Sequence, residues 1–239
     1  MMKRDRYYDV VMAAFVAVLL ISNVTANKLV QIWGLTLTGA TPFFPISYIF
    51  GDILTEVYGY ARTRRVIWTG FGLQALAAGG ILLAISLPPP KGLEEQANAF
   101  NRALSTTTWI VIGSLVAYWC GEFVNSYVLA RLKLLTQGRR LWTRTIGSTV
   151  VGQAVDTVVF VAIAFWLGSK ATGHPLPAAV LWKLVWSVYI FKVGVEVVLT
   201  PFTYLIVNAL KRVEGQDYFD RGTNFNPFSR RERRGRHPA

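Results

Sequence analysis

The chain has 239 residues, of which 53% are hydrophobic and 16% charged, and its formal net charge is +12. A disordered basic arm is excluded, because such segments lack the hydrophobicity needed to bury a core. An ordinary soluble domain is disfavoured, since its charged fraction is nearer about 25%. The single cysteine, Cys120, excludes an intramolecular disulfide framework and a multi-cysteine zinc site. We expect no metal and no other cofactor.

Long apolar runs dominate the chain, and crossing the hydrocarbon core of a bilayer takes about 20 mainly apolar residues. The runs predict six transmembrane helices, at about 9–32, 43–60, 66–87, 108–130, 146–167 and 179–210. We expect Pro88 to stop the third helix and Pro201 to kink or break the last. Strands are not expected, because the runs lack the alternation of a membrane barrel. The predicted fold is an all-α integral membrane protein, with a transmembrane domain at 1–212 and a basic cytoplasmic tail at 213–239.

The positive charge is distributed unevenly between the connectors. Nineteen of the 25 basic residues lie before the first run, after the second and fourth runs, or after the last run. Because cytoplasmic connectors are rich in Lys and Arg, this split predicts a multi-pass protein of the bacterial inner membrane with both termini in the cytoplasm. The bilayer, not nucleic acid, is then the partner of the positive charge. A cleaved signal peptide ending near Ala26 is an alternative, but its removal would leave an odd number of helices.

Ionisable side chains inside apolar runs are costly, so each is a functional candidate by default. Apart from Asp9 and Lys183, which lie near the starts of two predicted helices, seven lie within them: Lys28, Asp52, Glu56, Glu122, Asp156, Lys192 and Glu196. They are accompanied by amide side chains: Asn23, Asn27, Gln74, Asn125 and Gln153. A set of this size cannot face lipid, and it must line a cavity or pair off inside the bundle.

Four polar pairs are spaced by three or four residues, so the members of each pair share one helix face. These pairs are Asn23 with Asn27, Asp52 with Glu56, Glu122 with Asn125, and Gln153 with Asp156. Four pairs on four helices predict a lined polar cavity, although interhelical hydrogen bonds that fix the packing are the alternative for any one pair. Lys192 and Glu196 can neutralise each other, and Lys28 can neutralise a carboxylate on the second helix. We assign these three residues to charge balance.

Phe44 and Tyr48 precede the carboxylates of the second helix, where their rings can stack on a flat ligand or pack against lipid and core. A carboxylate accepts two parallel hydrogen bonds from a ring N–H and an adjacent exocyclic amine. Carboxylates, amides and aromatic faces therefore suit a flat heterocycle with a guanine-like donor edge. A proton or cation pathway would use similar residues.

Several segments resemble one known family. Residues 45–60, PISYIFGDILTEVYGY, followed by Arg62, resemble the signature of the queuosine precursor transporter family. Residues 22–28, SNVTANK, are similar to its first helix, and 192–201 and 214–228 to its C-terminal pattern. The resemblance covers about 9–228, and the loop at 88–107 is not matched.

The resemblance implies a six-helix importer that carries 7-deazaguanines, such as 7-cyano-7-deazaguanine, across the inner membrane. It also implies a fold related to the substrate-binding components of vitamin transporters. At the positions that match the motifs, the implied binding residues are Asn23, Asn27, Asp52 and Glu56. The cavity argument adds Glu122, Asn125, Gln153 and Asp156, with Phe44 and Tyr48 as stacking candidates. A homo-oligomer is left open.

Two other functions compete with an independent importer. One is the substrate-binding component of an ATPase-dependent vitamin or nucleobase uptake system, docked through small residues such as Ala13 and Ala17. The other is an intramembrane enzyme that uses Asp52 and Asp156 as a dyad. The enzyme is disfavoured, because the segment Ile49-Phe50-Gly51-Asp52 lacks, at its first position, a glycine that such enzymes show, and the chain offers no Ser–His or metal set.

Overall fold

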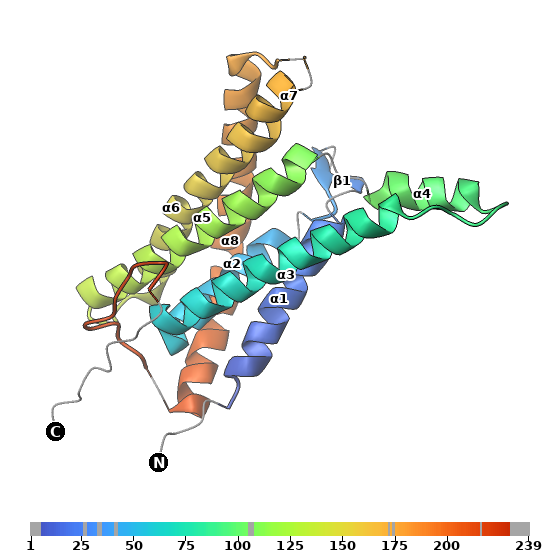
Figure 1. The fold of residues 1–239 in the computed structure, drawn as a ribbon. Helices are drawn as coiled ribbons and strands as arrows, with labels where there is room; N and C mark the ends of the chain where they lie inside the picture. Colours follow the sequence, from blue (N-terminus) through green and yellow to red (C-terminus); the bar gives the residue numbers. More distant parts are fainter. Residues whose placement is uncertain are drawn as a thin grey trace.

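The computed structural model describes residues 6–25, 28–32, 35–40, 43–104, 108–171, 173, 175–215 and 217–229. Figure 1 shows the arrangement of these elements. In chain order they are α1 (Tyr8–Thr25), β1 (Leu29–Ile32), β2 (Leu35–Thr38), α2 (Phe43–Tyr58), α3 (Tyr60–Ser86), α4 (Glu94–Leu104), α5 (Thr108–Leu135), α6 (Leu141–Phe160), the π-helical turn η1 (Val161–Leu167), α7 (Gly168–Ala171) and α8 (Ala178–Glu214).

The second helix returns the chain along the first. Beyond α1, the Gly39 amide donates to the Lys28 carbonyl at 2.7 Å and places the start of α2 near the end of α1. At the opposite end, the ring of Tyr58 packs edge-on against Tyr8, with 5.2 Å between centroids. Helix α2 therefore runs antiparallel to α1 over most of its length.

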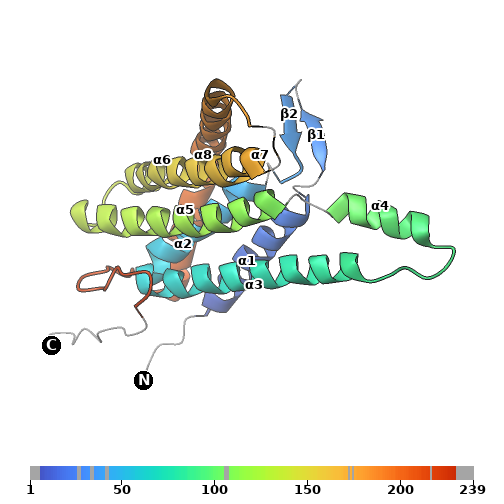
Figure 2. The ribbon, with the colours of Figure 1, turned by 45° about the horizontal axis from the view of Figure 1, so that its top comes forward.

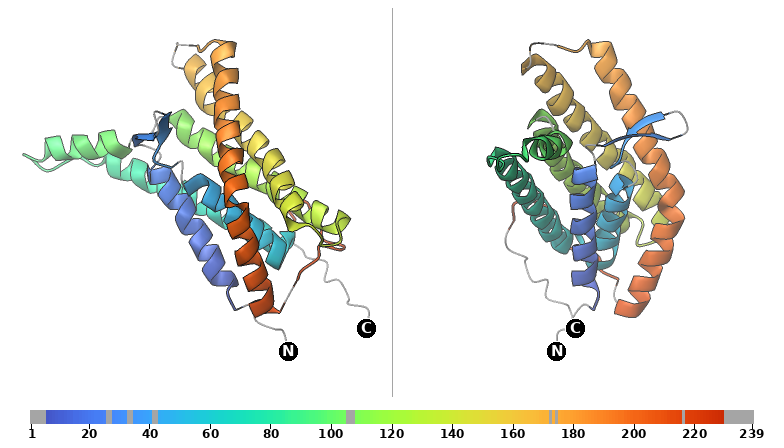
Figure 3. Two further views of the ribbon diagram at one scale, coloured as in Figure 1. Left: turned by 180° about the vertical axis from the view of Figure 1, so that it is seen from behind. Right: turned by 90° about the vertical axis from the view of Figure 1, so that its right-hand side faces the viewer.

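Helices α5 and α6 form a second antiparallel pair, which η1 and α7 extend. Near the start of α5, Trp109 lies against Gly168; near its end, Leu132 lies against Gly147. Helix α8 then runs the length of the bundle (Figure 3), and its last residue, Glu214, accepts hydrogen bonds from the amides of Arg6 and Tyr7 at 2.9 and 2.7 Å. The start of α1 and the end of α8 thus lie at one end of the molecule.

The distribution of polarity is that of a helical membrane protein. Among the described residues, four helical segments are long and apolar enough to cross a bilayer: α1, α3, residues 141–171 and α8. Large apolar side chains point outward, including Leu76, Leu83, Val198 and Leu205, whereas carboxylates and amides are buried. By the same criteria α2 and α5 are not included; α2 has only 16 residues. The six predicted crossings therefore remain a prediction.

The structure corrects several predicted boundaries. The first helix ends at Thr25 rather than Ile32, because Leu29–Ile32 and Leu35–Thr38 pair as antiparallel strands, and the expectation of no strands was wrong. The third helix begins at Tyr60 rather than Val66, so the predicted connector after the second helix is the first turn of α3. The unmatched loop at 88–107 contains α4, which projects from the bundle (Figure 2). Helix α8 continues through Pro201 without a break.

Gly59 makes the abrupt change from α2 to α3 possible. Its φ is +85°, a value that L side chains rarely adopt, and a Cβ there would lie 2.2 Å from the ring of Tyr218. Tyr218 belongs to residues 217–229, which we call the strap. The strap packs back over the bundle: the Asp220 carboxylate accepts from the Tyr60 amide at 3.1 Å, and the Pro227 carbonyl accepts from the Trp68 indole at 3.0 Å. The described part of the predicted tail is therefore an integral part of the fold.

Candidate functional site

Glycines allow the helices around the site to approach closely. A Cβ on Gly121 of α5 would lie 2.7 Å from the Cβ of Asp156 on α6, and one on Gly152 would lie 2.7 Å from the Cβ of Asn125. On α2, a Cβ on Gly51 would lie 2.6 Å from Oε2 of Glu122. Small residues serve the same purpose at helix interfaces in membranes generally. In this structure the glycines let polar side chains of α2, α5 and α6 lie close together at the same depth in the bundle.

Four carboxylates meet in the interior, and we call Asp52, Glu122, Asp156 and Glu196 the carboxylate cluster. They come from α2, α5, α6 and α8, and none is more than 6% exposed. The amides of Asn125 and Gln153 lie among them and are fully buried. The cluster is sealed in this structure, so a ligand could enter only after the helices part.

Hydrogen bonds tie the cluster together across the helices. Nδ2 of Asn125 donates to Oδ1 of Asp52 at 2.8 Å. Glu196 accepts from the Thr149 hydroxyl and, at 3.3 Å, from Nε2 of Gln153. The two amides thus orient two of the carboxylates, while Asp156 forms an ion pair with Lys192.

Several buried polar atoms in this region have no hydrogen-bond partner among the described residues. They are Oη of Tyr48, both carboxylate oxygens of Glu122, Oδ1 of Asn125 and Oε1 of Gln153. Buried polar groups are normally paired, because an unpaired one costs about 1–3 kcal/mol. An acceptor-rich, unsatisfied site suits a small ligand that brings its own donors.

Glu56 occupies a different environment one turn along α2. Its Oε1 contacts Nη2 of Arg144 at 2.7 Å, Nζ of Lys211 at 2.6 Å and Nζ of Lys133 at 3.4 Å. We call these three residues the cation cluster. Lys133 also donates to the backbone carbonyl of Glu56 at 2.6 Å. Three cations contact one oxygen of Glu56 and fix the side chain by ion pairs, whereas its Oε2 is buried and has no hydrogen-bond partner among the described residues.

The strap joins the cation cluster through Asp217, whose Oδ1 lies 2.6 Å from Lys133 and 2.9 Å from Lys211. Burial raises the pKa of Asp217, but the hydrogen bonds and charges of the two lysines outweigh it and hold that pKa below its ordinary value of 3.8. For Asp220, burial is the largest effect and raises the pKa. Asp217 is therefore ionised at neutral pH and links the strap to the bundle.

The structure brings together most of the predicted site residues and separates the rest. Tyr48, Asp52, Glu122, Asn125, Gln153 and Asp156 meet at the carboxylate cluster. Asn23 lies elsewhere and accepts from the Ser114 hydroxyl at 3.3 Å. Asn27 lies outside the described residues. Phe44 lies under the Lys192 ammonium group, 5.2 Å from its ring centroid.

The predicted charge balance is partly corrected. Lys192 pairs with Asp156 rather than with Glu196, which instead accepts from two neutral side chains. Lys28 is exposed beside β1 and forms no ion pair with a described carboxylate of α2. The cations next to a carboxylate of α2 are those of the cation cluster, all of which lie outside the apolar runs of the sequence.

A pattern in the sequence could have identified two of the missed cations. On α6, buried polar residues recur at helical spacing from Arg144 through Ser148 and Thr149 to Gln153 and Asp156. On α5, Glu122, Asn125, Ser126, Leu129 and Lys133 follow the same spacing and are buried. Extending each polar stripe by two turns reaches Arg144 and Lys133. The row of polar residues at helical spacing therefore shows which face of the helix is buried, and this face continues beyond the end of the apolar run.

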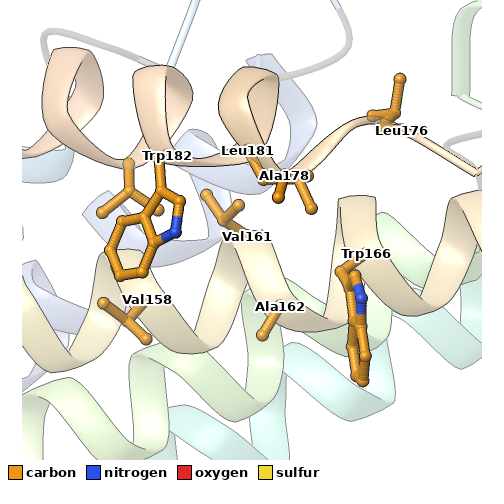
Figure 4. Close-up of a pocket in the computed structure, with 9 residues that line it drawn as sticks. Val158, Val161, Ala162, Trp166, Leu176, Ala178, Leu181 and Trp182 are labelled. Carbon is orange, nitrogen blue, oxygen red and sulfur yellow. The ribbon is translucent and has the colours of Figure 1, made fainter.

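A surface groove lies apart from these polar residues, between η1 and the start of α8. Its lining is apolar, with Val158, Val161, Trp166, Leu181 and Trp182 among its residues (Figure 4). A groove with so few hydrogen-bonding groups does not suit a donor-rich heterocycle. The carboxylate cluster is therefore the better candidate site.

Outward-facing apolar helices around a sealed polar centre define a multi-pass membrane protein built to hold a polar solute. The profile of the family described as "Putative vitamin uptake transporter" matches residues 38–206, and the chain belongs to this family. The chain is thus a transporter rather than an enzyme.

Two curated relatives agree with this assignment. One, from Bacillus subtilis (strain 168), is named "Probable queuosine precursor transporter"; it is 29% identical over 184 residues, which cover 77% of each chain. The other, from Escherichia coli (strain K12), is named "Queuosine precursor transporter"; it is 28% identical over 195 residues, which cover 80% of this chain and 83% of the relative. No solved structure matches the chain significantly.

Proposed function

We propose that this transporter imports queuosine precursors, 7-deazaguanine bases such as 7-cyano-7-deazaguanine, across the bacterial inner membrane. The observation that carries the proposal is the sealed centre beside Asp52, in which buried oxygens of Tyr48, Glu122, Asn125 and Gln153 have no hydrogen-bond partner among the described residues. The ring N–H and exocyclic amine of a deazaguanine supply such donors, and Asp52 can accept both in parallel. The names of the two relatives point to the same substrate class.

The proposed topology has six crossings with both ends of the bundle in the cytoplasm. Antiparallel packing supports the number, because α2 must return the chain along α1 before α3 can begin beside Tyr8. Likewise α5 must return it before α6. The basic residues near the start of α1, around residues 131–144 and after α8 support the orientation.

Substrate enters from the outer side and docks at the carboxylate cluster near the middle of the bilayer. Its donor edge pairs with Asp52, while the ring of Tyr48 offers a stacking face. The cation cluster and the strap close the cytoplasmic side. Inward release requires the contacts of Glu56 and Asp217 with Lys133 and Lys211 to separate.

The proposal is tested by uptake of labelled 7-cyano-7-deazaguanine into cells that cannot synthesise it. Wild-type protein restores uptake, and Asp52→Asn lowers it about tenfold or more, because a hydrogen bond to a charged group contributes about 1.5–3 kcal/mol. The matched control is Glu95→Gln on the projecting helix α4, where the carboxylate is exposed. This control retains uptake.

Two results would contradict the proposal, and each contradicts a different part. Normal uptake by Asp52→Asn, with the protein present in the membrane, refutes the assigned site. No uptake by wild-type protein refutes the function. The ATPase-dependent alternative predicts uptake only when a vitamin-transporter ATPase module is added; the exposed side chains of Ala13 and Ala17 on α1 leave room for such a partner.

A further inference from the structure

Glu122 differs from every other buried carboxylate in the described interior. Asp52 accepts from Asn125, Asp156 pairs with Lys192, and Glu196 accepts from two donors. Glu122 is 0% exposed, and neither of its oxygens has a partner among the described residues. Its lack of a donor therefore needs a physical explanation.

The charge around Glu122 makes an ionised carboxylate unfavourable. Its titratable or charged neighbours come from α2, from its own helix α5, from α6 and from α8: Tyr48, Asp52, Tyr118, Asp156, Lys192 and Glu196. The one cation among them, Lys192, is already paired with Asp156. A buried carboxylate without a cation or donor normally takes up a proton, because the cost of burying its charge is so large.

A proton fits this position better than a metal ion. The backbone of Gly51 lies so close that an added Cβ would be 2.6 Å from Oε2 of Glu122, which leaves no room for a hydrated cation. Within the described ranges, no three His, Cys, Asp or Glu side chains are arranged to hold a metal. Oδ1 of Asn125, three residues further along α5, is an unpaired acceptor, which suits a neighbouring carboxyl group that carries a proton to donate.

We propose that Glu122 is the coupling site of this transporter and carries one proton inward with each substrate molecule. In the sealed state the proton resides on the Glu122 carboxyl group. When the cytoplasmic side opens, water reaches the cluster, the carboxyl O–H bond breaks, and the proton leaves to the cytoplasm with the substrate. The emptied transporter returns to the outer side with Glu122 ionised, and the carboxylate then takes up a proton from the external solution. This role for Glu122 rests on the transport function proposed above.

The test uses purified full-length protein in liposomes, with labelled 7-cyano-7-deazaguanine and the membrane potential clamped at zero. With the outside one pH unit more acidic, wild-type protein accumulates substrate to about ten times the external concentration, because one pH unit is worth 1.36 kcal/mol per proton. A protonophore abolishes the accumulation, and a sodium gradient does not replace the pH gradient.

Glu122→Gln mimics the protonated carboxyl group and cannot release its proton. Its final substrate level is expected to equal the external level under the same gradient, whatever its exchange rate, because the endpoint is thermodynamic. Glu95→Gln is the matched control and accumulates substrate as the wild type does. Accumulation by Glu122→Gln equal to that of wild-type protein overturns the proposal. So does a wild-type endpoint that is independent of pH or follows sodium.

An infrared measurement on purified protein tests the proton itself and does not depend on substrate. Wild-type protein at neutral pH shows the carbonyl stretch of a buried carboxylic acid, and Glu122→Gln loses that band. The absence of the band from wild-type protein overturns the proton site, even if transport is present. If the band is present but wild-type protein neither exchanges nor accumulates deazaguanine, the proposed substrate fails and the proton site stands.

Discussion

Asp52 and Glu56 are one helical turn apart on α2, yet their side chains lie in different surroundings. Four residues of α-helix rise by about 6 Å, which is enough to move a side chain from one layer of the bundle to the next. Asp52 lies among other acids and accepts from an amide, whereas Glu56 is surrounded by the cation cluster. Asp52 is suited to recognition, and Glu56 to holding α2, α5, α6 and α8 together.

This difference predicts a large loss of stability for Glu56→Gln. The substitution leaves Lys133 and Arg144 buried without a counter-charge on α2, and breaking a buried ion pair from one side costs about 3–5 kcal/mol. Thermal unfolding of the purified protein in detergent measures the effect. Glu95→Gln serves as the exposed control. An unchanged unfolding temperature for Glu56→Gln would show that the cation cluster contributes little.

Sequence spacing predicted which residues face inward but not how their charges are compensated. Spacing on each helix placed Asp52, Glu122, Asn125, Gln153 and Asp156 on inward faces, because helix geometry is local. The partners of Glu56 could not be found in this way, since α5, α6 and α8 supply them only after folding. Lys133 and Arg144 were interpreted as connector charges because they lie at the ends of apolar runs.

At the scale of elements, the seam between α5 and α6 positions the site. Gly121 and Gly152 leave space for backbone and side chains of the opposite helix, and the polar residues beside them reach the same level. Hydropathy located these helices, but α5 ends at Leu135 rather than residue 130, and α6 begins at Leu141 rather than residue 146. Hydropathy also missed the strands Leu29–Ile32 and Leu35–Thr38 and the early start of α3. A backbone turn at Gly59 and a contact from the distant Asp220 determine where α3 begins.

A methyl group at the seam is expected to damage the site. In Gly121→Ala the new Cβ would lie 2.6 Å from Oη of Tyr48 and 2.7 Å from Cβ of Asp156, so the helices must separate. Overpacking of this kind costs about 1–3 kcal/mol, and substrate binding weakens with it. Gly72→Ala on α3 is the control, since nothing lies within 4 Å of its added Cβ and alanine favours the helix.

Unfolding temperature and equilibrium binding of 7-cyano-7-deazaguanine measure both variants. Gly121→Ala is expected to unfold at a lower temperature and to bind substrate more weakly than wild-type protein does. Gly72→Ala is expected to bind as the wild type does and to be equally stable or slightly more stable. If Gly121→Ala binds substrate as tightly as wild type does, the close approach of α5 to α6 is not what positions the cluster.

For the whole molecule, the proposed topology places Lys91 outside and Arg139 in the cytoplasm. Both are exposed in connectors, and Cys120 is the single native cysteine, so single-cysteine variants are simple to prepare. In a Cys120→Ala background, Lys91→Cys should react with a membrane-impermeant thiol reagent in intact cells. Arg139→Cys should react only after the membrane is permeabilised. Labelling of both from the same side would refute the six-crossing topology.

The clasp between Glu214 and the amides of Arg6 and Tyr7 has a consequence for parity. A chain that starts and ends on the same side of a bilayer crosses that bilayer an even number of times. Crossings of this chain can therefore be gained or lost only in pairs, so α2 and α5 either both cross the bilayer or both do not. A reporter that fixes the side of residue 6 fixes the side of residue 214 as well, without a second measurement.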